Sequence, residues 1–90
     1  MLHDKIVEEL FQKKSLAALI WLVQNGRELE FCYKKEVYFL LRYETQAAVS
    51  IWHGKEEQAF ENIETLLEQG LIAGKRFIDI WNEIECKILF

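Results

Sequence analysis

The feature that most constrains the fold is a change in the spacing of apolar residues across Gly26–Tyr33. Before this segment, apolar side chains recur every three or four residues, as they do along one side of a helix. From Leu29 onward they alternate with other residues, as in a strand with one buried face. The chain is therefore expected to pass from helix to sheet at this point.

Residues 4–25 are predicted to be helical, with Asp4 as the N-cap and Asn25-Gly26 as the stop, because glycine accepts the left-handed conformation that ends many helices. Lys13-Lys14-Ser15 leaves two interpretations open. It is either the end of one helix and the cap of another, or the polar side of one continuous helix. We favour two helices and expect residues 1–14 to be the more loosely attached.

Three strands follow, and their alternation predicts an antiparallel meander. Leu29–Tyr33 is half-buried, Val37–Tyr43 is apolar on both sides, and Ala47–Trp52 comes after a polar Glu44-Thr45-Gln46 turn. The strands are therefore expected to form one small sheet, with the second strand in its centre.

The turn between the first two strands sets which side chains face each other. Because Lys-Lys is a poor type I′ turn, we favour a longer Lys34-Lys35-Glu36 loop. This loop pairs Tyr33 with Val37, Phe31 with Phe39 and Leu29 with Leu41. A two-residue turn is the alternative, and it places Glu30 opposite Phe39.

After His53-Gly54-Lys55, which is expected to end the sheet, two C-terminal helices are predicted. Glu56–Gln69 carries apolar residues at helical spacing, and Lys75–Asn82 forms a second, shorter helix after the apolar connector Leu71–Gly74. Residues 83–90 fit either a strand or a helix, and extended structure is favoured. The prediction is a single α+β domain over residues 1–90: an N-terminal helix or helix pair, a three-stranded antiparallel meander, and two C-terminal helices packed on one face.

Composition and charge exclude several classes of function. The 90 residues are 51% hydrophobic, which indicates a packed domain, and the formal net charge of −4 disfavours nucleic-acid binding. The start of the chain lacks the basic and apolar regions of a secretory signal, and the longest apolar run, Leu16–Val23, is too short to span a bilayer. A cytoplasmic protein without membrane contact is expected, and therefore reduced thiols at Cys32 and Cys86.

Catalytic and cofactor chemistry finds little support in the residues. The two cysteines have neither a CxxC spacing nor a nearby histidine pair, so no metal site is predicted. His3 and His53 are the only histidines, and neither serine lies in a nucleophile motif. We therefore expect no enzyme activity and no cofactor.

Binding is the function that the residues favour, and Trp52 is the residue that points to it. Tryptophan usually fills a core, but Trp52 lies on the opposite face from Val49 and Ile51 and beside a turn. We predict a partner-binding surface formed by Tyr38, Arg42 and Trp52, since such residues anchor protein interfaces. The partner is either an unidentified protein or a second copy, in a homodimer formed by the sheet face or an edge strand.

Nucleic-acid binding is the alternative function. It would use the basic doublets together with exposed tyrosine or tryptophan side chains that stack on bases. The doublets are Lys13-Lys14, Lys34-Lys35 and Lys75-Arg76.

The chain also resembles a group of small, uncharacterised bacterial proteins. The likeness covers about Leu16–Glu85 and rests on the apolar helix ending in Gly26-Arg27-Glu28-Leu29-Glu30-Phe31, on the aromatic hairpin through Tyr33 and Tyr38, and on Ile72–Trp81. Members of that group often have glycine in the first hairpin turn, from which Lys34-Lys35 departs. The resemblance implies the fold and carries no activity.

Overall fold

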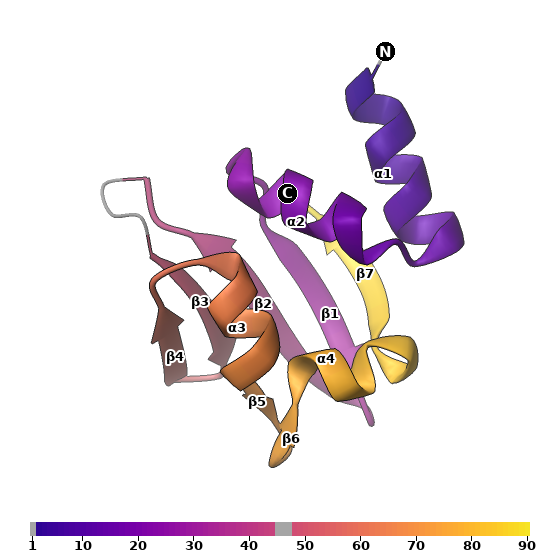
Figure 1. The fold of residues 1–90 in the computed structure, drawn as a ribbon. Coiled ribbons are helices and arrows are strands. Elements are labelled where there is room, and N and C mark those ends of the chain that lie inside the picture. The colour runs from indigo at the N-terminus through magenta and orange to yellow at the C-terminus, as the bar shows by residue number, and fades with distance from the viewer. Residues whose placement is uncertain (1, 45–47) are drawn as a thin grey trace.

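The fold is a five-stranded antiparallel sheet with helices on one of its faces (Figure 1). The structure is a computed structural model, and it describes residues 2–44 and 48–90. The strand order is β4-β3-β2-β1-β7. The strands are β1 (Leu29–Tyr33), β2 (Glu36–Arg42), β3 (Val49–His53), β4 (Glu56–Phe60) and β7 (Glu85–Leu89).

The helices lie together in front of the sheet as Figure 1 draws it, and α1 extends beyond α2. A two-stranded hairpin, β5 and β6, joins α3 to α4, and a 3₁₀ turn follows α4. The bounds are α1 (Leu2–Lys13), α2 (Leu16–Gln24), α3 (Ile63–Gln69), β5 (Leu71–Ile72), β6 (Lys75–Arg76), α4 (Phe77–Ile80) and the 3₁₀ turn η1 (Trp81–Glu83).

The N-terminal segment forms two helices, as favoured from the sequence. Lys14 separates them with a left-handed φ of 54°, and the Ser15 side chain caps α2 by accepting a hydrogen bond from the Ala18 amide at 3.1 Å. The prediction of Asp4 as the first cap is wrong, because α1 already begins at Leu2. The predicted stop is confirmed: Asn25 is the C-cap of α2, and Gly26 has φ 84°.

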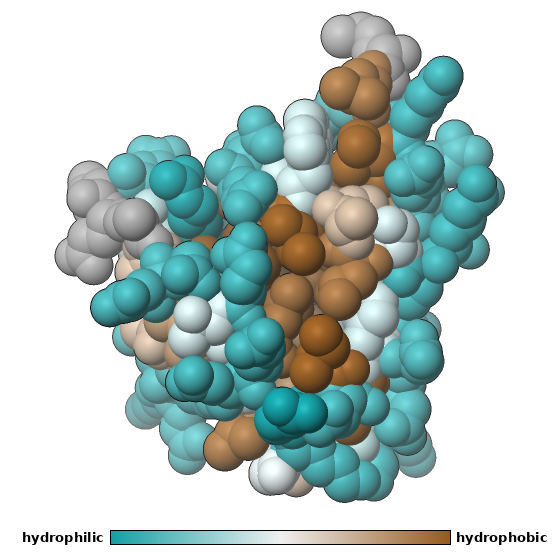
Figure 2. Space-filling model, viewed as in Figure 1, coloured by the Kyte–Doolittle hydropathy of each residue, from teal (hydrophilic) through white to brown (hydrophobic). Residues whose placement is uncertain are grey.

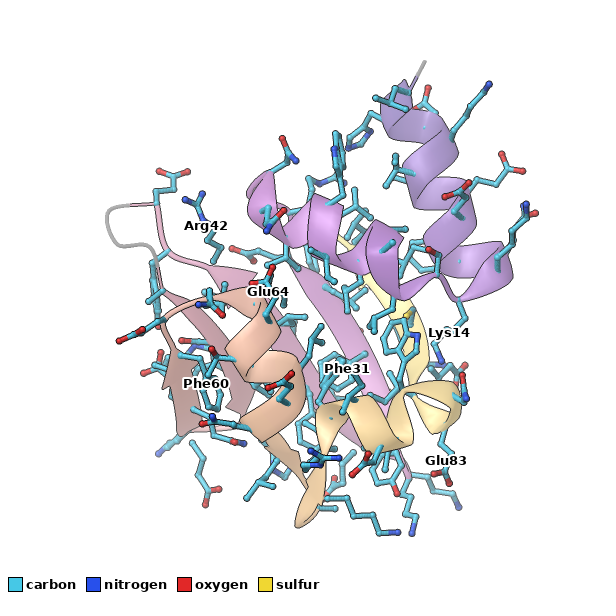
Figure 3. All side chains as sticks on the ribbon, viewed as in Figure 1. Lys14, Phe31, Arg42, Phe60, Glu64 and Glu83 are labelled. Carbon is cyan, nitrogen blue, oxygen red and sulfur yellow. The ribbon has the colours of Figure 1, made fainter. Side chains whose placement is uncertain are left out.

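Lys14, between α1 and α2, contacts the C-terminal part of the chain (Figure 3). Its ammonium group donates hydrogen bonds to the carbonyl oxygens of Trp81, at 2.8 Å, and of Ile84, and it lies 4.7 Å from the centre of the Trp81 ring. The Trp81 indole N–H in turn donates to the Lys14 carbonyl at 2.9 Å. The junction between α1 and α2 is thus connected through one lysine to the segment that leads into β7.

The predicted longer loop between β1 and β2 is wrong. Lys34 and Lys35 alone form the turn, with φ values of 49° and 72°, so that Tyr33 faces Glu36 and Glu30 faces Phe39. The twist of a two-residue turn with positive φ at both positions matches the twist of the strands. This match, together with the packing of one apolar face, offsets the cost of placing lysines in the left-handed region.

The sheet has two strands more than predicted. Residues 56–60, expected to begin a helix, form β4 instead, because a turn at Gly54 (φ 61°) leads the chain back along β3. The helix begins only at Ile63, where the Asn62 side chain accepts a hydrogen bond from the Thr65 amide at 2.8 Å. The favoured extended structure near the C-terminus is confirmed as β7, which pairs with β1. Thr45, Gln46 and Ala47, assigned above to a turn and a strand, lie outside the described residues.

The C-terminal connector and helix also differ from expectation in detail. The expected apolar connector is the β5–β6 hairpin, in which Ile72 is buried and the Gln58 side chain bonds the backbone N–H and C=O of Leu71 at 2.8 and 2.7 Å. The helix predicted over Lys75–Asn82 is shorter: it consists of α4 and the 3₁₀ turn.

The core lies between the sheet and the helices. Phe31 is at its centre (Figure 3), with Tyr38 stacked on it at 5.3 Å between ring centres and Phe77 packed edge-on at 5.6 Å. The strand residues that are buried toward the helices are Leu29, Phe31, Tyr33, Tyr38, Leu40, Val49 and Ile51.

Replacing Lys35 by glycine tests the turn. Because glycine adopts φ 72° without strain, we expect Lys35→Gly to raise the free energy of unfolding by about 1 kcal/mol. Lys55→Gly is the matched control, since Lys55 does not have positive φ; there glycine is expected to lower stability by roughly 0.5 kcal/mol or more. Urea denaturation measures both, and equal losses in the two variants would contradict the assigned turn.

Candidate functional site: the open face of the sheet

The side of the sheet that faces away from the helices has an apolar cluster. We call this surface the open face and define it by Cys32, Val37, Phe39, Leu41, Trp52 and Ile88. Alternation along the strands places these residues opposite to the buried Phe31, Tyr38, Leu40 and Ile51, and Phe39 lies directly across from Trp52. Val37 and Ile88 are 43% and 48% exposed, whereas the others are half-buried.

Phe39, Leu41 and Trp52 are half-buried for a different reason from other half-buried apolar residues. Ile20, Trp21 and Phe60 are also half-buried, but they pack against the main core. Phe39, Leu41 and Trp52 do not belong to that packing and lie on the other side of the sheet. They cover one another on a sheet face that no described helix covers (Figure 1).

The helix side has an apolar area of its own, but of a different kind. Figure 2 shows a band of apolar residues that runs from α1 across α2 between charged side chains. Its half-buried members on these helices, Ile6, Val7, Leu16, Ile20 and Trp21, are the outer edges of side chains that fill the core. We therefore place the candidate site on the open face.

A polar cluster lies at the β4 side of the open face. The Ser50 hydroxyl, fully buried, donates a hydrogen bond to the Glu57 carboxylate at 2.7 Å, and the Tyr43 hydroxyl donates to the same group. Both hydrogen bonds hold the pKa of Glu57 below its usual value, and the bond from Tyr43 has the larger effect. Glu57 is thereby kept ionised next to Trp52, its neighbour across the strands.

Charged residues also lie at the β7 side. Glu30 is half-buried between Phe39 on one neighbouring strand and Ile88 on the other. Lys87 donates to the Glu85 carboxylate at 2.7 Å; this bond, and more weakly the nearby Cys32 and Glu30, raise the pKa of Lys87. The open face thus has an apolar centre with carboxylates on both sides.

The structure separates the three residues predicted to form the binding surface. Trp52 is on the open face, whereas Tyr38 and Arg42 are on the helix side, so the predicted patch of all three is wrong. Tyr38 is only 4% exposed and stacks between Phe31 and His53, and burial raises its pKa. The error follows from the turn: the two-residue form brings Phe39 and Leu41, which the prediction left out, beside Trp52.

Arg42 is exposed and lines a shallow depression on the helix side (Figure 3). The depression measures about 220 Å³, below the usual range of roughly 300–1,000 Å³ for small-molecule sites. Its other lining residues are Gln24, Val49, Glu61, Asn62 and Ile63.

Both outer strands carry features that oppose pairing with another strand. Two of the five residues of β4 are glutamates, and a register shift opposite Glu30 and Phe31 bends β7. Charged residues and bulges are the common ways in which natural sheets protect their edges. The face is therefore the better candidate for binding than the edge strands that an edge-paired homodimer would use.

The basic doublets are only partly free to bind nucleic acid. The Lys14 ammonium bonds two backbone carbonyls, and Arg76 forms a two-pronged ion pair with Asp79 at 2.8 and 3.0 Å. The structure offers no additional support for nucleic-acid binding, which stays a prediction, as does the absence of enzyme activity.

The two thiols lie on opposite faces of the sheet. Cys32 pairs with Glu85 on the open face, whereas Cys86 pairs with Phe31 on the helix side, and both are free. Burial raises the pKa of Cys86, which lowers its reactivity near neutral pH. Cys32 is thus a specific chemical probe of the open face.

Two further findings concern the described residues only. Within residues 2–44 and 48–90, no group of three His, Cys, Asp or Glu side chains is arranged to hold a metal ion. None of the helices there has the length and apolar content needed to cross a membrane.

Comparison of the chain with protein-family models gives no match, and comparison with curated proteins and with solved structures gives none either. The resemblance to a group of small bacterial proteins therefore stays a prediction.

Two tryptophans allow a test of the open face by stability alone. Trp81 is 6% exposed in the core, so we expect Trp81→Ala to lower the free energy of unfolding by about 3–5 kcal/mol. Trp52 loses mainly its contact with Phe39, so Trp52→Ala is expected to cost about 1 kcal/mol. Urea denaturation compares the two, and equal losses would place Trp52 in the core.

Proposed function

We propose that this chain is a protein-interaction or regulatory protein that binds another protein through its open face. The observation that carries the proposal is that Phe39, Leu41 and Trp52 lie together on an uncovered sheet face and do not pack on the core. Aromatic side chains at the centre of a patch are typical anchors of protein interfaces. An antiparallel sheet that keeps one face in water usually carries polar residues across that face, whereas the centre of this face is formed by Phe39, Leu41 and Trp52, and its carboxylates lie beside them.

The size of the open face supports a transient complex. With strands about 4.8 Å apart and about 3.4 Å per residue, a face of five short strands measures roughly 20 by 17 Å. These dimensions give a flat area of about 340 Å², less than half of the roughly 800 Å² that each partner buries in an interface of standard size, so binding through this face alone is expected to be weak. We expect reversible binding, with Phe39 and Trp52 as its anchors.

Photo-crosslinking from the open face tests the proposal. A benzoyl-phenylalanine replaces Trp52 in one variant and Ile78 in a matched control, since Ile78 is an exposed apolar residue on α4. In the cells that make the protein, we expect a discrete adduct after irradiation from position 52 and none from position 78.

The mass of the adduct identifies the partner class. A heavier, discrete product that contains another polypeptide supports the proposal, whereas a product of twice the chain mass shows that a second copy occupies the face. Equal adducts from both positions, or none from position 52, would contradict the proposal.

A further inference from the structure

We infer that the partner presents lysine or arginine side chains next to apolar ones. This inference rests on the proposed function and names the chemistry of the surface that fits the open face. The observation behind it is the arrangement of charged side chains around Phe39 and Trp52, because these charges favour some partners over others.

The positions of the charged residues can be read from one row of paired residues that runs across the sheet. The paired positions in this row are Glu57, Trp52, Phe39, Glu30 and Ile88, in the order β4, β3, β2, β1, β7. A carboxylate therefore stands on each side of the aromatic pair. Two residues further along β1, Cys32 lies opposite Glu85, whose ion-pair partner is Lys87. Three carboxylates of the open face, those of Glu30, Glu57 and Glu85, thus outnumber the single ammonium group of Lys87.

Glu30 is the carboxylate with the strongest effect on partner choice. It is half-buried between Phe39 and Ile88. The nearby ammonium group of Lys87 is paired with Glu85, and among the described residues no cation lies within ion-pair distance of Glu30. A partner that covers Phe39 also removes water from Glu30. Burying an unpaired carboxylate is costly, so a partner with a cation at this point is strongly preferred over a purely apolar one.

Glu57 adds to this preference on the other side. Its bonds from Tyr43 and Ser50 fix the carboxylate beside Trp52 and keep it charged. A partner cation near Trp52 would be attracted to a carboxylate that is already held in place. Binding would therefore not pay the entropy cost of immobilising the Glu57 side chain.

A second copy of the chain is disfavoured by the same charges. Face-to-face packing would bring two sets of carboxylates together, each with an excess over the single Lys87. Like charges across an interface oppose association. A basic partner with apolar side chains satisfies both the apolar centre and the carboxylates.

Protection of Cys32 from alkylation tests the inference. The protein carries Cys86→Ser, so that Cys32 is the only thiol, and its rate of reaction with a maleimide is measured against three synthetic peptides. Each peptide has about ten residues, roughly two strand lengths, and alternates Val with Lys, Val with Glu, or Ser with Lys. We expect only the Val/Lys peptide to slow the reaction.

The matched variants are Glu30→Gln on the open face and Glu64→Gln, an exposed carboxylate on α3 (Figure 3). Glu30→Gln is expected to weaken protection by the Val/Lys peptide about fivefold, as for the loss of one partly buried charge pair. Glu64→Gln should leave protection unchanged.

Three outcomes would overturn the inference. Equal protection by the Val/Lys and Val/Glu peptides means that the face binds apolar surfaces without regard to charge, which leaves the proposed function intact. Equal protection by the Ser/Lys peptide means that charge alone drives binding. No protection at millimolar peptide removes the assigned chemistry, and crosslinking from position 52 then decides separately whether the open face binds a protein.

Discussion

The two-residue turn at Lys34-Lys35 is the constraint on which the rest of the structure depends. Side chains along a strand alternate with a period of two, so moving β2 by one residue would exchange its faces completely. The observed register buries Tyr38 and Leu40 under the helices and leaves Phe39 and Leu41 on the other side. The set of residues on the open face depends on this register.

The register also explains why the sheet has two unlike faces, both apolar. On one side, Phe31 and its neighbours are covered by α2, α3 and α4, and this packing provides the stability of the domain. On the other side, Phe39 and Trp52 lie outside that packing, and we propose that they bind a partner. In this proposal Glu30 and Glu57 select the kind of surface that binds.

Much of the fold could be predicted from the sequence because local signals agreed with the final structure. Ser15 as a cap and Gly26 as a stop specified the bounds of α2. The alternation of Ile84, Cys86 and Ile88 favoured the extended structure of β7, although a register shift puts Cys86 and Ile88 on opposite faces. β4 was missed because its three charged or amide residues and Phe60 fit a helix start equally well, and only pairing with β3 makes them a strand.

The candidate site was predicted only in part, and for one physical reason. Trp52 was identified because alternation within its own strand already determines the face on which it lies. Tyr38 and Arg42 were assigned to the same surface as Trp52, although the register puts them on the helix side of the sheet. The reason is that two lysines are unusual in a two-residue turn, so a longer loop was predicted. Cross-strand pairing is non-local, and one wrong turn misplaces every residue of the next strand.

The most direct test of the account is a measurement of the β1–β2 register by proton NMR. In an antiparallel pair closed by Tyr33 and Glu36, alternation makes Glu30–Phe39 and Cys32–Val37 the narrow pairs, with Cα atoms about 4.5 Å apart. The two-residue turn predicts strong nuclear Overhauser effects between the α-protons of these two pairs. Effects that instead connect Phe31 with Phe39 and Tyr33 with Val37 would show the longer loop, bury Phe39, and remove the open face as described.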